Sequence, residues 1–145
     1  RLSDLNLFEL SWLSGLAITS LEDAILACKT LRRLGPKWVI CTSAWQKDEW
    51  LHNIAVGPDN MVQVRVPFVP DKKIVPKGTG DAFAAILLGH YLNHGDIPVA
   101  LSWASSALHG LIRGSIRRNA DELAIISEHH QINSPSCMFP IENLG

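Results

Sequence analysis

A glycine-rich turn within residues 75–83 (Val-Pro-Lys-Gly-Thr-Gly-Asp-Ala-Phe) constrains the fold of this chain more than any other stretch. Upstream of it, valines alternate with other residues over 62–66, which is the pattern of a half-buried strand. Downstream, the apolar run from Ala82 to Leu92 predicts a helix. Backbone N–H groups and the positive end of the helix dipole then meet at the turn. The sequence therefore predicts a phosphate-binding site there.

Asp81 is the unusual residue of this turn. Its carboxylate would repel a bound phosphate unless it takes a proton from another group, and a kinase acting on a hydroxyl group needs such a base beside its phosphate site. The alternative is structural, because aspartate is also a favourable N-cap and a Gly-x-Gly-Asp sequence is weak evidence by itself. From these residues alone both interpretations stay open.

Composition narrows the class of protein. The chain has 145 residues, enough for one domain with a core, and its 47% hydrophobic and 19% charged residues indicate a globular protein. A net charge of −1 gives no reason to expect a nucleic-acid or membrane partner. The three cysteines have no metal-binding spacing and predict reduced thiols in a cytoplasmic protein. Because the chain begins at Arg1 without a methionine, we expect a fragment or a processed chain.

Helical and strand patterns alternate along the chain. Spacing and capping residues predict helices over residues 7–13, 21–34 and 82–94, and another from Asp96 onward. Apolar runs predict strands over residues 38–42, 51–56 and 61–66, the last two as an antiparallel hairpin. Residues 122–126 fit a short strand or a short helix, and residues 129–145 are predicted to be a loop.

Four motifs occur in an informative order: Asn-Leu-Phe-Glu-Leu at 6–10 with Leu-Ser-Gly at 13–15, Ile-Cys-Thr-Ser at 40–43, Lys-Gly-Thr-Gly-Asp at 77–81, and Asp-Glu-Leu at 121–123 with Ile-Asn-Ser-Pro at 132–135. Together they resemble the C-terminal half of a pyridoxal kinase of the ribokinase-like superfamily. The resemblance implies a three-layer α/β/α fold from which the N-terminal half is absent. Residues 1–128 would be the C-terminal part of the kinase domain, and residues 129–145 a loop-like tail.

The resemblance implies ATP-dependent phosphorylation of the 5′-hydroxymethyl group of pyridoxal, a step of vitamin B6 salvage, with ATP and Mg²⁺ as cofactors. Asp81 would be the catalytic base that deprotonates this hydroxyl group. Gly78, Thr79 and Gly80 would form the anion hole for the transferred phosphoryl group.

Further site residues follow from the same resemblance. Glu9 would organise Mg²⁺ through water, with Asn6 near the phosphates. Thr42 and Ser43 would line the ATP phosphate site, and Lys77 would reach a phosphate.

Two features depart from the family. Asp4 and Leu5 stand where Thr-Pro usually precedes the asparagine. The family's N-terminal half, which supplies the first strands, much of the pyridoxal pocket and the lid, has no counterpart in these residues. We therefore expect the chain to hold half of an active site. By itself, without the other half, it would then be inactive.

Three alternatives remain. One is a hydroxymethylpyrimidine kinase, although those relatives often carry Cys where Asp81 stands. Another is a different small-molecule kinase of the superfamily, although its sugar kinases more often show Gly-Ala-Gly-Asp, without Thr79. The third is a truncated, non-catalytic chain that binds nucleotide or associates with itself through uncovered apolar surfaces. The expected partners are a small-molecule substrate and a second copy in a homodimer.

His90 and His94 stand four residues apart on one face of a predicted helix. This spacing can bind a metal ion. Because no third ligand is near in sequence, we interpret them as a surface or packed pair.

Overall fold

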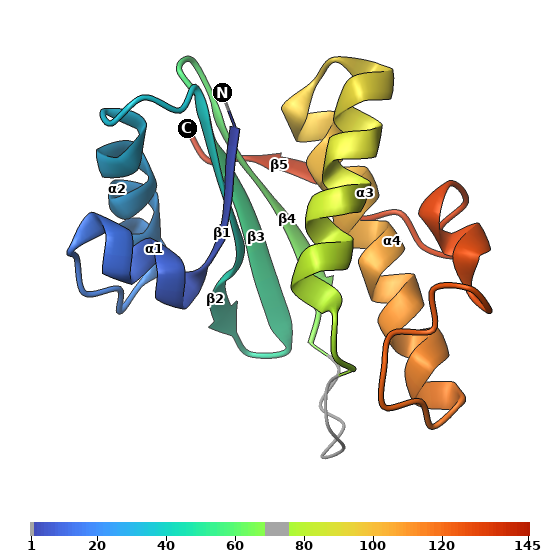
Figure 1. The fold of residues 1–145 in the computed structure, drawn as a ribbon. Helices are drawn as coiled ribbons and strands as arrows, with labels where there is room; N and C mark the ends of the chain where they lie inside the picture. Colours follow the sequence, from blue (N-terminus) through green and yellow to red (C-terminus); the bar gives the residue numbers. More distant parts are fainter. Residues whose placement is uncertain (1, 69–75) are drawn as a thin grey trace. The chain divides into compact units, whose positions relative to one another are not determined.

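The computed structural model describes residues 2–68 and 76–145 and divides into two compact units. The first comprises residues 1–67 and 141–145, and the second residues 68–140. Figure 1 shows a mixed sheet with two helices in the first unit and a pair of longer helices in the second. Each unit is described by itself.

The sheet of the first unit has five strands in the order β1 (Leu2–Asn6), β2 (Trp38–Lys47), β3 (Trp50–Val56), β4 (Met61–Pro67) and β5 (Ile141–Asn143). Strands β1 and β2 are parallel, and the other neighbouring pairs are antiparallel. Two helices, α1 (Leu7–Ser14) and α2 (Leu21–Arg32), connect the parallel pair.

The core of this unit lies between α2 and the sheet. Ala24, Ala27 and Cys28 of α2 are fully buried with Val39 of β2 and Ile54 of β3. The apolar run predicted as a strand is therefore confirmed as a buried one. The hairpin predicted from its turn is also confirmed, with β3 and β4 paired from Val56–Met61 to Trp50–Pro67.

The second unit is built on α3 (Thr79–His94) and α4 (Ile97–Arg117), followed by a short 3₁₀ helix, η1 (His129–Ile132). As predicted, α4 begins after Asp96, whose side chain accepts a hydrogen bond from the Val99 N–H group at 2.9 Å. None of the described helices is long and apolar enough to cross a membrane.

Two glycines on α4 receive buried polar side chains from the segment around η1. A methyl group added at Gly110 would collide with Gln131, and one added at Gly114 would collide with Glu128. Glu128 is buried and pairs with Arg118, whose Nε lies 3.1 Å from its Oε1. The small residues of α4 thus allow a close approach that larger ones would prevent.

Some elements differ from the sequence-based expectation. Strand β1 was not predicted, and β2 continues to Lys47 through an irregularity between Cys41 and Trp45. Residues 122–126 form neither strand nor helix, only a single bridge between Glu122 and Lys77 and a turn.

The segment 129–145, predicted as a loop, holds η1 and β5. Short segments of this kind take their structure from distant partners. Ser102 Oγ donates to the carbonyl oxygen of Phe139 at 2.6 Å, and β5 pairs with β4. The assignment of residues 1–128 to one kinase domain stays a prediction.

Strand β1 carries a carboxylate in an unfavourable place. In the part of the chain that the structure describes, Asp4 Oδ1 is buried without a hydrogen-bond partner. Burial, and to a smaller extent the charge of Glu9, raises the pKa of Asp4 from 3.8 to about 6, against the effect of a backbone hydrogen bond at Leu5. An ionised Asp4 therefore costs the folded state free energy at neutral pH.

Replacing Gly114 with alanine should lower the free energy of unfolding by about 1–3 kcal/mol, because the new methyl group meets buried Glu128. The matched control is Gly89→Ala on α3, where an added methyl group meets no described atom within 4 Å. That variant should gain up to ~1 kcal/mol from helix propensity. Urea unfolding measures both, and equal losses would contradict the packing of Glu128 on Gly114.

Asp4→Asn should raise the free energy of unfolding by about 1–2 kcal/mol at about pH 8, allowing for solvent screening of a partly exposed side chain. The pKa of Asp4 is raised on folding, so its cost develops as pH rises from about 4 to about 6 and is absent below that range. Near pH 3.5 the variant should therefore match the parent. Denaturant unfolding across this pH range checks it, with exposed Asp59→Asn as control.

Candidate functional site

The predicted phosphate-binding turn lies in the second unit, at the start of α3. Gly78 precedes the helix with φ of 91°, a left-handed conformation that favours glycine. Lys77 is fixed to a distant segment, because its N–H group donates to the Asp121 carbonyl and its own carbonyl accepts from Leu123, each at 3.2 Å. These two backbone hydrogen bonds fix the start of the turn to residues 121–123. Val75, the first residue of the predicted stretch, lies outside the described residues.

The first turn of α3 presents donors without partners inside the helix. Its first backbone hydrogen bond runs from Ala82 N–H to the Gly78 carbonyl at 3.0 Å. The N–H groups of Thr79, Gly80 and Asp81 precede it and have no acceptor within the helix, and among the described residues no side chain caps them. A methyl group built on Gly80 would meet no described atom within 4 Å. Backbone donors of this kind at the start of a helix attract anions.

Asp81 is the third residue of α3 and is exposed. The N-cap is Gly78, which has no capping side chain, so the alternative that Asp81 caps the helix is wrong. A carboxylate in the first turn is favoured by the helix dipole. Its exposure leaves it available to accept a proton from a bound molecule.

In the first unit, Asn6 and Glu9 form a reciprocal capping box at the junction of β1 and α1. Asn6 Oδ1 accepts a hydrogen bond from the Glu9 N–H group, and Glu9 Oε2 accepts one from the Asn6 N–H group, both at 2.9 Å. Sequence reasoning missed this role, although Asn-x-x-Glu before an apolar run signals it. The box employs only one carboxylate oxygen of exposed Glu9, so the other can still contact a hydrated cation.

Thr42 lies directly opposite Asn6 in the parallel pair of strands. Its hydroxyl group donates to the Leu5 carbonyl at 3.5 Å. The next residue, Ser43, has a positive φ of 50°, which is uncommon outside glycine. Its N–H group donates to Asn53 Oδ1 at 2.8 Å, so β3 stabilises this strained backbone. Asn53 is a contributor that sequence reasoning missed.

The predicted site residues thus fall into two groups. Asn6, Glu9, Thr42 and Ser43 meet in the first unit. Lys77, Gly78, Thr79, Gly80 and Asp81 form one turn of the second. Among the described residues, no group of three or more His, Cys, Asp or Glu side chains is placed to hold a metal ion. Water and phosphate oxygens would have to supply most ligands of a Mg²⁺ ion, which is its usual preference.

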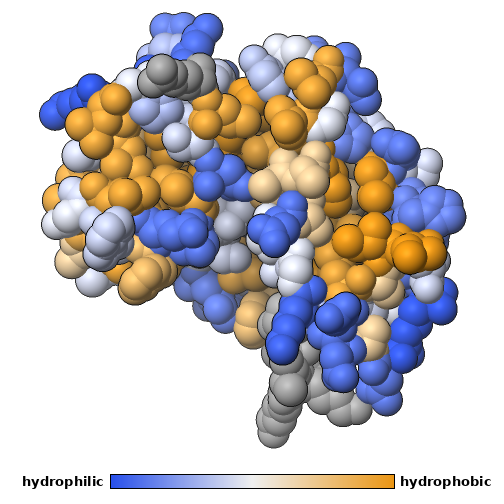
Figure 2. All heavy atoms as spheres, viewed as in Figure 1, coloured by the Kyte–Doolittle hydropathy of each residue, from blue (hydrophilic) through white to orange (hydrophobic). Residues whose placement is uncertain are grey.

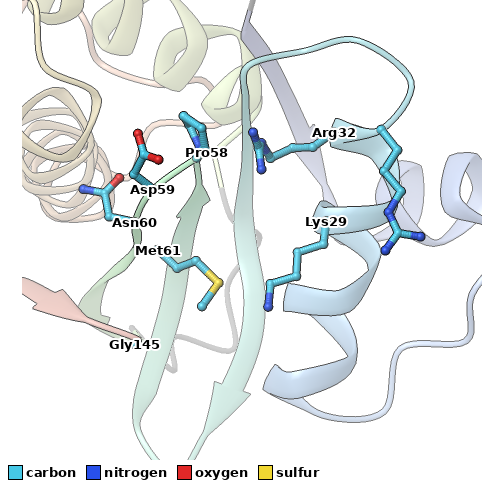
Figure 3. Close-up of a pocket in the computed structure, with 9 residues that line it drawn as sticks. Lys29, Arg32, Pro58, Asp59, Asn60, Met61 and Gly145 are labelled. Atoms are coloured by element: carbon cyan, nitrogen blue, oxygen red, sulfur yellow. The ribbon is translucent and has the colours of Figure 1, made fainter.

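The first unit also contains a pocket of about 520 Å³ that includes none of these residues. Lys29 and Arg32 extend into it from α2, opposite the β3–β4 turn with Asp59 (Figure 3). Pairing of Val39 with Val56 puts this turn at the end of the sheet where β2 begins, away from Thr42. Cations at the C-terminus of α2 are already explained by its helix dipole.

A comparison with known sequences finds one family. The profile of the family described as phosphomethylpyrimidine kinase matches residues 5–125. A pyridoxal kinase of Rubrobacter xylanophilus is 29% identical over 144 residues, covering 97% of this chain and 49% of that protein. A pyridoxal kinase of Granulibacter bethesdensis is 31% identical over 141 residues, covering 92% and 48%. The chain spans about half the length of these curated relatives.

Solved structures agree on the fold. The crystal structure of pyridoxal kinase from Trypanosoma brucei matches with a TM-score of 0.86 at 26% identity, covering 99% of this chain and 51% of that one. Pyridoxal kinase from Leishmania donovani in complex with ADP and pyridoxamine matches with a TM-score of 0.89 at 24% identity, covering 99% and 52%. The predicted α/β, ribokinase-like fold is confirmed, as an incomplete one. With a profile match over residues 5–125, the chain belongs to the phosphomethylpyrimidine kinase family.

Proposed function

We propose that this chain contributes the phosphoryl-transfer residues of a kinase that uses ATP to phosphorylate the 5′-hydroxymethyl group of pyridoxal, in vitamin B6 salvage. The observation that carries the proposal is the start of α3, where N–H groups without a helical acceptor and an exposed Asp81 that is not the N-cap occur within one turn. The names of the relatives support the substrate class, since both sequences and the two structures compared above are pyridoxal kinases.

In this proposal Gly78, Thr79 and Gly80 bind the transferred phosphoryl group. Negative charge grows on its oxygens during transfer, and fixed backbone donors stabilise that charge without having to reorganise. Lys77 is exposed beside them and can add a positive charge. A methyl group built on Gly80 meets no described atom within 4 Å, which in this proposal leaves room for the anion beside the turn.

Asp81 is proposed as the base. As the hydroxyl oxygen of the substrate attacks the γ-phosphorus, the hydroxyl proton passes to the Asp81 carboxylate and the bond to the leaving ADP oxygen breaks. The exposed Asp81 carboxylate is suited to this task, because it is not the N-cap of α3 and solvent reaches it.

The residues of the first unit are proposed to act on ATP and its metal. Mg²⁺, when bound, would spread the negative charge of the phosphates. Glu9 would hold it through water, using the oxygen that the capping box leaves over. Asn6, Thr42 and Ser43 would contact phosphate oxygens at the end of β1, where ligands commonly sit in α/β sheets.

A second candidate is phosphorylation of a hydroxymethylpyrimidine. The family description favours it, as does a structure described as a putative phosphomethylpyrimidine kinase from Bacteroides thetaiotaomicron, with 25% identity and a TM-score of 0.83. Asp81 favours pyridoxal, since the pyrimidine enzymes often have Cys there. Comparing kcat/KM for the two substrates in the full gene product decides between them.

We further propose a homodimer in the cytoplasm. Apolar side chains lie at the surface of each unit on the face seen in Figure 2. In the chain as a whole, the side chains of Trp12, Leu34 and Leu92 are about three-quarters exposed. Such surfaces favour association with another chain. The cytoplasmic location is supported by free thiols, including buried Cys28 and Cys41.

Asp81→Asn should lower kcat at least ~10²-fold in the full gene product and leave ATP affinity nearly unchanged, because the amide cannot accept the proton. Steady-state kinetics with Mg·ATP and pyridoxal measure this. Asp96→Asn is the matched control, since asparagine also caps α4. Near-normal turnover of the Asp81 variant would show that another group is the base.

Gly80→Ala should weaken ATP binding at least ~10-fold without destabilising the fold, because its methyl group fills the space reserved for phosphate and meets no described protein atom. Calorimetric titration with Mg·ATP and urea unfolding give the two quantities. Gly89→Ala, on the same helix, should change neither greatly. If the variant binds ATP with the same affinity as the parent, the phosphate does not bind at this turn.

A further inference from the structure

The second unit contains a histidine cluster that the proposed phosphoryl transfer does not use. His90 and His94 lie on one face of α3, and Trp103 of α4 stacks on both imidazole rings. The ring centroids of Trp103 and His90 are 4.9 Å apart, and those of Trp103 and His94 are 5.9 Å apart. His90 is buried, whereas His94 is exposed. The cluster is therefore rigid on one side and open to solvent on the other.

The tautomer of neutral His90 follows from the hydrogen bond of its ring. Nε2 lies 2.9 Å from the carbonyl oxygen of Ile132 in η1. A carbonyl oxygen only accepts, so Nε2 carries the proton and neutral His90 has its lone pair on Nδ1. Nδ1 faces His94 Nε2 at 3.5 Å, and the two rings are parallel within 2°. A lone pair is thus fixed in direction toward a second imidazole nitrogen.

The separation of these nitrogens suits a metal ion. Two imidazole nitrogens on one tetrahedral Zn²⁺, each at about 2.0–2.1 Å, are about 3.3–3.4 Å apart. The observed 3.5 Å is close to this value and long for a hydrogen bond between the rings. The contact of His90 Nε2 with a backbone carbonyl is the kind of outer hydrogen bond that orients metal-binding histidines.

We propose that His90 Nδ1 and His94 Nε2 bind one divalent transition-metal ion, such as Zn²⁺ or Cu²⁺, with water as the remaining ligands. Among the described residues no third His, Cys, Asp or Glu is placed to join them, which points to a reversible site. Nitrogen ligands favour these ions over Mg²⁺, which prefers oxygen. This site is chemically separate from that of Mg·ATP.

Calorimetric titration with Zn²⁺ tests the proposal on the folded chain. One Zn²⁺ per chain should bind, and His94→Gln should weaken binding at least tenfold, because the exposed ligand is lost while the fold is kept. His130→Gln is the matched control, since His130 is also exposed and lies beside a carboxylate, with its Nε2 3.7 Å from Glu128 Oε2. Circular dichroism confirms that both variants are folded.

A second measurement locates the ion. Cu²⁺ bound by the two histidines should quench Trp103 fluorescence, so Trp103→Phe should remove most of the quenching. Millimolar Mg²⁺ should not compete. Absent Zn²⁺ binding, binding unchanged in His94→Gln, or binding lost in His130→Gln overturns the proposal. Each outcome is independent of whether ATP binds at the start of α3.

Discussion

The proposed phosphate site depends on one backbone constraint, the left-handed Gly78 that starts α3, whose first N–H groups have no acceptor within the helix. This turn is fixed from α4. Ser115, buried on α4, accepts a hydrogen bond from the Ala124 N–H group at 2.8 Å and donates to the Leu111 carbonyl at 2.7 Å. The segment so anchored holds Lys77 by two backbone bonds. Donors positioned before a ligand arrives need no reorganisation when charge develops.

The Asn6–Glu9 pair shows how one motif can serve structure and function together. Its spacing is fully explained by the capping box, so the motif alone does not establish a metal role. The same bonds orient Glu9 and leave one carboxylate oxygen for a hydrated cation. Asp4 stands where the family usually has threonine, and burial, followed by the charge of nearby Glu9, raises the pKa of Asp4 to about 6. The ionised Asp4 carboxylate therefore lowers the stability of the first unit close to Glu9, the residue predicted to hold Mg²⁺.

Sequence reasoning succeeded where the signal is local. Capping residues and helical spacing located α2, α3 and α4, and turn residues located the β3–β4 hairpin. It failed for β1 and β5, because such short strands are defined by their partners rather than by their own residues. The continuation of β2 past Ser43 depends on Asn53, and the orientation of His90 depends on Ile132, both contacts between residues distant in sequence. The glycine turn at the start of α3 was predictable because the residues that form it, 77–81, are consecutive in the sequence.

In the proposed function, the first-turn amides of α3 bind the phosphates of ATP. The most direct measurement is the amide NMR spectrum of ¹⁵N-labelled chain during titration with Mg·ATP. We expect saturable shifts of the Thr79, Gly80 and Asp81 amide signals, larger than those of the first-turn amides of α4, which the Asp96 side chain caps. Saturable binding that leaves these three signals unmoved, or no binding by the folded chain, would contradict it.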